Sequence, residues 1–197
     1  MFVLLYMLYM VYFPPSWKLG KLPAEWKEGI VLSLYKEKGS RSECSSYRPI
    51  TFLSVPGKVF AHVLLARLDS LLQKHRRPHQ FRSTCCRSTL DAILALCLLA
   101  EIHREIQQPL LVAFVNLKAV FDSVDGNALW KAMCGVGVPS VLMNLIIDLH
   151  TASSARVRLA GRLSKPFTMT SSVRQGCILA PALFCRAMDY IMDRLSR

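Results

Sequence analysis

The most regular pattern along the chain is the spacing of apolar residues between Gly57 and His75. These residues recur every three or four positions, which is the period of one helix face: Val59, Phe60, Val63, Leu64, Leu68, Leu71 and Leu72. A second helix is predicted within 88–106, where Ser88 as N-cap and Asp91 three positions later form a capping-box pattern. Shorter helices are predicted over 127–134 and 139–150, and a last one from about Leu179 onward.

Other stretches have the length and composition of β-strands. Residues 29–35 are rich in apolar and β-branched side chains, which favours a strand. Residues 109–116 form a short continuous apolar run, which predicts a strand buried on both faces. Residues 155–161 and 167–173 alternate in polarity as two strands of a hairpin or small sheet do. The mixture predicts the α+β class, with helices packed on a small mixed sheet.

Composition limits the function classes. The chain has 197 residues, of which 52% are hydrophobic. It can therefore form one domain with a core, or one domain plus a partial neighbour, and disorder is not expected. Lys and Arg total 25 against 13 Asp and Glu, for a net charge of +12. Such a surplus favours a polyanionic partner, either nucleic acid or an anionic membrane surface. A basic globular protein with an unrelated partner remains the alternative.

The cysteines and the apolar N-terminal residues indicate in which cellular compartment the protein is found. The seven cysteines are odd in number and show no C-x-x-C spacing, which argues against a disulfide framework or a zinc site and favours free thiols inside the cell. The apolar residues 1–13 would span about 20 Å as a helix, less than the roughly 30 Å of a bilayer core. They predict a core helix, or a helix whose upstream partner is missing from this chain, with secretion or membrane anchoring as the alternative.

Three blocks of residues carry candidate chemistry. The first is "KEKGSRSECSSYRPI", where Lys36, Lys38, Arg41 and Arg48 surround a turn. Lys and Arg neutralise phosphate charge, so cations on a loop beside a strand suit a triphosphate. A solvated basic loop with no ligand is the alternative, because exposed charges are the default.

The second block is "FVNLKAVFDSVD", from Phe114 to Asp125. A strand that ends in an acid, followed by a turn and an aromatic residue, is how a two-metal polymerase site holds Mg²⁺. The strand ends here in an amide, Asn116, and the next acids are Asp122 and Asp125. Both acids also suit helix capping before the helix predicted at 127–134.

The third block is "SSVRQGCILAPALF". Arg174, Gln175 and Gly176 supply a cation, an amide and a flexible backbone position ahead of a helix. Such a glycine lets the backbone approach a nucleotide or a templating base closely. A simple strand-to-helix turn remains the alternative.

Together the blocks are more specific than any one alone. Their order and wording closely resemble the reverse transcriptase domain of non-LTR retrotransposons, most of all the RTE-type elements. The stretches that carry this resemblance are, in order, "LPAEWKEGIVLSLYKEKG", "SSYRPITFLSVPGKVFAHVLLARL", "FVNLKAVFDSVD" and "VRQGCILAPALF". The resemblance runs from about Trp17 to the end. It implies a right-hand fold, with an N-terminal helix and fingers at 1–108 and a partial palm at 109–197.

The resemblance also implies residue roles. Asn116 matches the first catalytic, metal-binding aspartate, and Phe121 matches the aromatic gate against a ribose 2′-hydroxyl. The other matches fall on positions that contact the nucleotide or belong to the palm motif: Lys36, Arg48, Arg174, Gln175, Gly176 and Pro181. The family implies Mg²⁺, an RNA template, a DNA primer and deoxynucleoside triphosphates, in the nucleus or cytoplasm. Neither a structural metal nor a membrane is expected.

Two departures from the family bear on activity. Asn116 offers a carbonyl oxygen but no charge, so it would bind Mg²⁺ poorly. The family's paired-aspartate hairpin follows the "RQGC" block, and no Asp-Asp pair occurs before Arg197; Asp189 and Asp193 lie four residues apart on a predicted helix. We therefore expect a polymerase fragment that is inactive as it stands. A residual, sequence-independent RNA- or DNA-binding module is the alternative.

Overall fold

The computed structural model describes residues 13–82, 84, 86–117, 123–159, 161–169, 173 and 176–195. Residues 13–19 are helical. The remaining elements follow in chain order: the 3₁₀ helix η1 (Ala24–Lys27), β1 (Glu28–Tyr35), the 3₁₀ helix η2 (Cys44–Ser46), β2 (Tyr47–Leu53), α2 (Val55–Lys74), α3 (Thr89–Glu105), α5 (Gly126–Cys134), α6 (Ser140–His150), β3 (Ser154–Leu159), β4 (Arg162–Leu163), β5 (Phe167–Thr168) and α7 (Ala180–Leu195).

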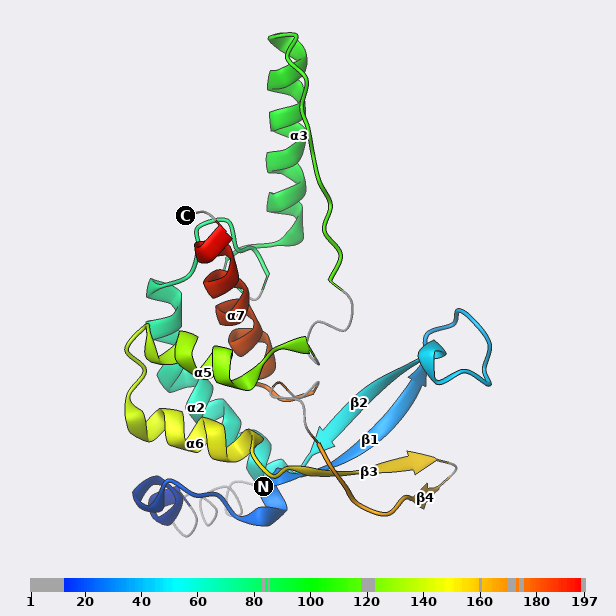
Figure 1. Cartoon of the computed structure of the whole chain (residues 1–197), viewed down its shortest axis with the longest axis vertical. Helices are drawn as coiled ribbons and strands as arrows, with labels where there is room; N and C mark the ends of the chain where they lie inside the picture. Colours follow the sequence, from blue (N-terminus) through cyan, green and yellow to red (C-terminus); the bar gives the residue numbers. More distant parts are fainter. Residues whose placement is uncertain are drawn as a thin grey trace.

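The strands form one mixed five-stranded sheet. Its order is β2-β1-β3-β4, and β5 pairs with β3. β1 runs antiparallel to β2 but parallel to β3, so segments more than a hundred residues apart in sequence become neighbours. Figure 1 shows β1 and β2 reaching away from the helices, with η2 at the tip of their hairpin. The sheet therefore joins the first and last parts of the chain.

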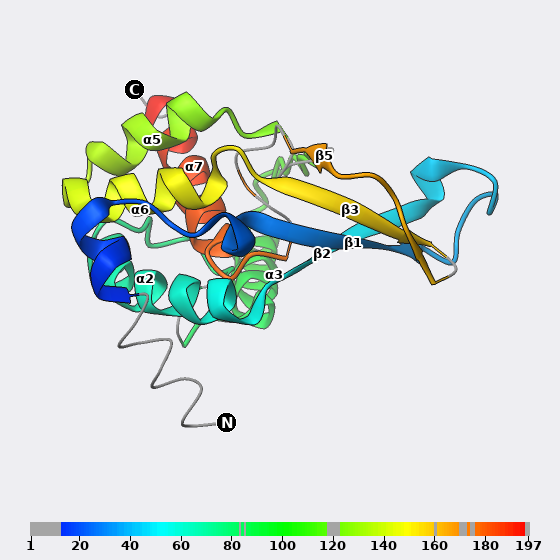
Figure 2. The same ribbon diagram turned by 90° about the horizontal axis from the view of Figure 1, so that it is seen from below.

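Helices α2, α5, α6 and α7 gather at one end of the strands (Figure 2). α2 begins where the Ser54 side chain accepts a hydrogen bond from the Gly57 N–H, a serine N-cap. Its apolar stripe recurs every three to four residues and is buried: Phe60, Ala61, Leu64, Leu68 and Leu72. This is the helix face that the spacing predicts, so α2 forms one wall of the core.

An aromatic cluster connects the chain's start to this wall. The ring of Phe60 lies 5.0 Å from that of Phe13 and 5.4 Å from that of Trp26. Asp148 on α6 accepts a hydrogen bond from the Leu22 N–H at 2.8 Å and pairs with Lys27 at 2.7 Å. These contacts fix the segment that leads into β1 against both α2 and α6.

Most predicted elements are confirmed. The structure has helices at α2, α3, α5, α6 and α7 and strands at β1 and β3, within a few residues of the predicted bounds. Of the strand predicted at 167–173, only Phe167–Thr168 form β5. The serine N-cap and capping box at Ser88 and Asp91 are both present. β2 was not predicted, because its sequence "YRPITFL" contains proline and follows a polar loop. Residues 1–12 lie outside the described part, so the predicted N-terminal helix can be compared only from residue 13.

The strand predicted at 109–116 is wrong. The segment has no strand pairing, and Leu111, Phe114 and Val115 are 93%, 86% and 82% exposed. A strand needs a neighbour to satisfy its backbone groups, and none of the five strands lies beside this run. An apolar run indicates burial but does not say against what, so the sequence could not supply the missing partner.

α3 is the second exposed element. None of its residues is buried, although the helix is apolar on most sides. Figure 1 shows α3 projecting from the body, with the chain running back beside it towards residue 117. No helix among the described residues is long and apolar enough to cross a membrane.

Candidate nucleotide-binding site

The tip of the β1–β2 hairpin carries the first block. Lys36 follows β1 directly; its N–H donates to the Ser46 carbonyl at 2.8 Å and its Nζ donates to the Ser45 carbonyl at 2.7 Å. Arg48 lies on β2 opposite Leu34, with its side chain exposed. The strand pairing thus brings the two predicted phosphate contacts, twelve positions apart, to one end of the hairpin.

Two tyrosines order this tip. The rings of Tyr35 and Tyr47 pack 5.5 Å apart across the strand pair. The Tyr35 hydroxyl donates to the Gly39 carbonyl at 2.5 Å, and the Tyr47 hydroxyl donates to the Arg41 carbonyl at 2.8 Å. The Arg41 guanidinium lies 5.1 Å from the centre of the Tyr35 ring. The exposed cations therefore stand on a loop with defined internal contacts.

Gly176 brings the third block to the same sheet. It has a φ of +103°, and a Cβ added there would collide with the backbone carbonyl of Thr51 on β2. A Cβ added at Gly29 would also lie close to this residue, 2.6 Å from the Thr51 Cγ2. Only glycine fits such close approaches. Thr51, three residues beyond Arg48, thus links the first block to the third.

Sequence reasoning missed Thr51. The residue is 5% exposed, and β2 was not predicted. The sequence offered two signals. Thr51 is a small polar residue inside an apolar stretch, and Gly29 lies in a predicted strand, where no turn explains a glycine. Both glycines have their reason in Thr51.

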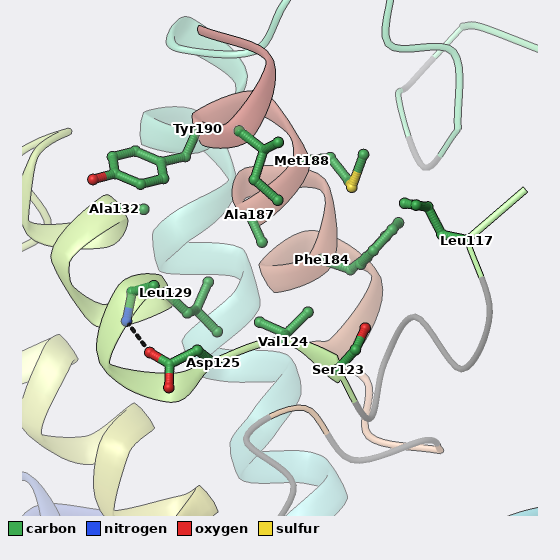
Figure 3. A pocket seen from close by; sticks show the side chains of 12 residues that line it. Leu117, Ser123, Val124, Asp125, Leu129, Ala132, Phe184, Ala187, Met188 and Tyr190 are labelled. Atoms are coloured by element: carbon green, nitrogen blue, oxygen red, sulfur yellow. Dashed lines mark hydrogen bonds between the residues drawn. The ribbon is translucent and has the colours of Figure 1, made fainter. Parts of the chain in front are cut away.

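Asn116 stands apart from this arrangement. It is exposed and belongs to the unpaired segment before residue 117. Leu117 borders a cavity of about 370 Å³ between α5 and α7, together with Val124, Phe184 and Met188. Figure 3 shows these apolar side chains around the cavity, with Asp125 at its edge. The cavity is an apolar hollow and not a cluster of oxygen ligands.

The acids near Asn116 have structural roles where they are described. The Asp125 Oδ1 accepts a hydrogen bond from the Ala128 N–H at 2.7 Å and caps α5, which is the capping alternative raised by the sequence. Asp122 and Phe121 lie outside the described residues, as do Arg174 and Gln175. The predicted roles of these four positions stay predictions.

The acids on α7 are placed differently from a catalytic pair. Asp193 pairs with Arg77 at 2.8 Å on the surface. Asp189 is buried, and this burial raises its pKa despite the opposing charges of Arg186 and Arg76 and a hydrogen bond from the Arg77 backbone. Both side chains hold α7 to the loop that follows α2.

The donor set for Mg²⁺ does not fit within the described part of the chain. No three side chains among His, Cys, Asp and Glu converge there in a way that could hold a metal ion. Asn116 supplies a neutral oxygen, and the Asp125 carboxylate is engaged by the helix cap. We therefore derive no catalytic step through a metal from these residues.

Comparison with known proteins shows which protein family the chain resembles. Residues 35–197 match the family model "Reverse transcriptase (RNA-dependent DNA polymerase)". The chain is 25% identical over 88% of its length to the transposon TX1 uncharacterized 149 kDa protein of Xenopus laevis. It is 25% identical over 85% of its length to a probable RNA-directed DNA polymerase from transposon X-element of Drosophila melanogaster.

A third relative is more similar in sequence. The chain is 31% identical over 90% of its length to a putative 115 kDa protein in the type-1 retrotransposable element R1DM, also of Drosophila melanogaster. It spans 13%, 19% and 17% of these three relatives. The matched model covers both the hairpin with Lys36 and Arg48 and the block around Gly176. The chain therefore belongs to the reverse transcriptase family, as a domain of the non-LTR retrotransposon type.

Proposed function

We propose that this polypeptide is a nucleic-acid-binding part of a retrotransposon RNA-directed DNA polymerase, and that its 197 residues do not perform the polymerase chemistry themselves. The resemblance of the motif blocks supports the second half, because it matches Asn116 to the family's first metal-binding aspartate. A neutral amide oxygen binds a hard cation less well than a carboxylate does. Loss of that charge removes several kcal/mol of transition-state stabilisation, on the scale quoted for metal catalysis.

The substrates of the proposed function follow from the family. They are an RNA template, a DNA primer and deoxynucleoside triphosphates. Residues 1–108 would form the N-terminal helix and fingers, and residues 109–197 a partial palm. Within the family, the wording of the motif blocks favours the RTE-type elements.

Exposed cations support nucleic-acid affinity. Lys36, Lys38, Arg41 and Arg48 are all exposed around the β1–β2 tip, on a chain of net charge +12. Contacts from such side chains to phosphates are independent of sequence. Each neutralised phosphate contributes roughly 0.7–0.9 to the slope of log affinity against log salt. We therefore expect binding that weakens steeply as salt rises.

Primer extension tests the proposed loss of chemistry. The 197-residue chain and its Asn116→Asp variant are each incubated with a primed RNA template, Mg²⁺ and nucleotides, beside a reverse transcriptase of known activity. We expect no extended primer from either, because the variant restores one carboxylate while the 197 residues still contain no Asp-Asp pair. Synthesis of cDNA by the parent chain would refute the proposal.

A further inference from the structure

Helix α3 carries a regular apolar seam on a surface that the fold leaves uncovered. None of its residues is buried, and Figure 1 shows the helix projecting from the body. Apolar residues recur along α3 and its C-cap at alternating intervals of three and four, which places them on one side of a helix. We call this set the α3 seam: Ala92, Ala95, Leu99, Ile102 and Ile106. Its three large members are 48%, 52% and 57% exposed.

The charges of α3 are opposite in sign to those of the whole chain. Asp91, Glu101 and Glu105 stand against the single arginine Arg104, within a chain of net charge +12. Acids repel phosphate, so neither a nucleic acid nor an anionic membrane surface suits this helix. The α3 seam itself carries no charge, and charged residues are depleted at the core of protein–protein interfaces. The helix therefore fits a protein partner.

The order of side-chain sizes along the α3 seam is complementary to itself. Its first two residues are alanines, and the next two are Leu99 and Ile102. When two copies of α3 lie antiparallel with their two-fold axis at the height of Cys97, Ala95 of each copy faces Leu99 of the other. Ala92 then faces Ile102. Each layer combines a small and a large side chain, which fills the space between the helices without voids.

The available area is that of a weak dimer. A helix of 17 residues is about 25 Å long and about 10–12 Å across with its side chains. One lengthwise half of it presents roughly 500 Å² of accessible surface, so two copies bury about 1,000 Å², which is the lower limit for a specific interface. We therefore expect a dissociation constant in the micromolar range.

We propose that two copies of this chain associate reversibly through their α3 seams, with the two helices antiparallel. The inference is independent of the proposed nucleic-acid function, because α3 lies outside the motif blocks that indicated the family. Two repulsions oppose the contact. Each copy has a net charge of +12, and Asp91 of one copy lies near Glu105 of the other, since both acids directly precede a seam residue. Salt screens both repulsions, so the dimer tightens as salt rises, whereas nucleic-acid binding weakens.

Sedimentation equilibrium of the full chain across the micromolar range, at low and at high salt, tests the proposal. The protein is first treated with nuclease, because a bound nucleic acid could bridge two copies. The test variant combines Leu99→Lys with Ile102→Lys. The matched control combines Leu90→Lys with Leu94→Lys, which adds the same charge at leucines of α3 that are 73% and 58% exposed and lie outside the α3 seam.

The parent chain is expected to pass from monomer to dimer as its concentration rises. The test variant is expected to dimerise more than roughly 100-fold more weakly, because each dimer loses four apolar contacts and brings cations together. The control variant is expected to dimerise as the parent does. Circular dichroism checks that both variants keep their helix content, and because α3 buries no residue neither variant is expected to unfold.

Disulfide cross-linking tests the direction of the helices. A chain with Ala95→Cys is mixed with a chain with Leu99→Cys, both with Cys97→Ala, and oxidised with diamide. An antiparallel pair is expected to link position 95 of one copy to position 99 of the other, whereas a parallel pair would link position 99 to itself. Mass spectrometry of the linked peptides identifies which bond forms.

Each outcome decides the proposal. A parent chain that stays monomeric throughout the concentration range overturns it, and leaves the proposed nucleic-acid function untouched. A dimer that both lysine variants preserve equally lies elsewhere on the molecule and also overturns it. Linkage of position 99 to itself rejects the antiparallel arrangement. Loss of the dimer in the test variant alone, with linkage of position 95 to 99, supports the inference.

Discussion

Gly176 is held against the backbone of Thr51, and this contact joins two motif blocks that are far apart in sequence. Two costs would follow from a side chain there. The φ of +103° disfavours any L-residue, and a Cβ would meet the Thr51 carbonyl. Gly137 separates the two costs, because it has a φ of +78° but no atom within 4 Å of an added Cβ.

We predict that Gly176→Ala destabilises the fold more than Gly137→Ala does. The conformational cost is about 1–2 kcal/mol at each site, and displacement of the Thr51 backbone adds about 1–3 kcal/mol at Gly176 alone. Urea unfolding of both variants measures the difference. Equal losses would show that β2 moves aside at no cost and that the contact does not hold the blocks together.

Two helices begin with the same serine cap but differ in what they bury. Ser54 caps α2, whose Phe60, Leu64 and Leu68 are fully buried. Ser88 caps α3, which buries no residue. Most helix stability in proteins comes from packing of one face against the fold, and α3 lacks such packing. Its capping box therefore defines where it begins without connecting it to the core.

We predict that the same substitution has different effects in the two helices. Ser54→Ala should lower the free energy of global unfolding by about 1 kcal/mol, the usual value of a serine N-cap. Ser88→Ala should leave the global transition unchanged and instead speed hydrogen exchange of the amides in 89–105, because α3 opens locally. A shift of the global midpoint by Ser88→Ala would contradict this and show that α3 is coupled to the core.

At the scale of the whole molecule, α7 holds the helical end together through charged side chains. Arg186 is buried, and its Nε donates to the Ala132 carbonyl of α5 at 3.2 Å. Asp189 lies on the same helix beside Arg186, Arg76 and Asp193, and burial raises its pKa. A carboxylate is costly in such a place even with cations near, because desolvation opposes the charged form.

We predict that the stability of the protein depends on pH through Asp189. Because its pKa is raised above 3.8 on folding, the folded state binds the proton more tightly than the unfolded state. As pH falls through the raised pKa of the folded state towards 3.8, the contribution of Asp189 to the free energy of unfolding therefore increases. Asp189→Asn mimics the neutral carboxyl and should lack this dependence. Thermal unfolding of both chains across the acid range measures it; parallel curves would contradict the prediction.

Much of the fold could be predicted from local patterns. The buried stripe of α2 followed from its spacing, and the caps at Ser88 and Asp125 followed from residue type, because both depend on atoms a few positions away. The motif blocks identified the family for the same reason: their order and wording are properties of the chain. The match of Asn116 to a catalytic aspartate also comes from the sequence alone, and it stays a prediction.

The tertiary structure decided what depends on partners distant in sequence. The parallel pairing of β1 with β3 could not be inferred from either strand alone, because register depends on which strands meet. The close approach of Gly176 to Thr51 depends on the same assembly. The apolar run at 109–116 predicted a buried strand, yet it lies exposed, because an apolar sequence specifies burial only where the fold supplies a surface to cover it.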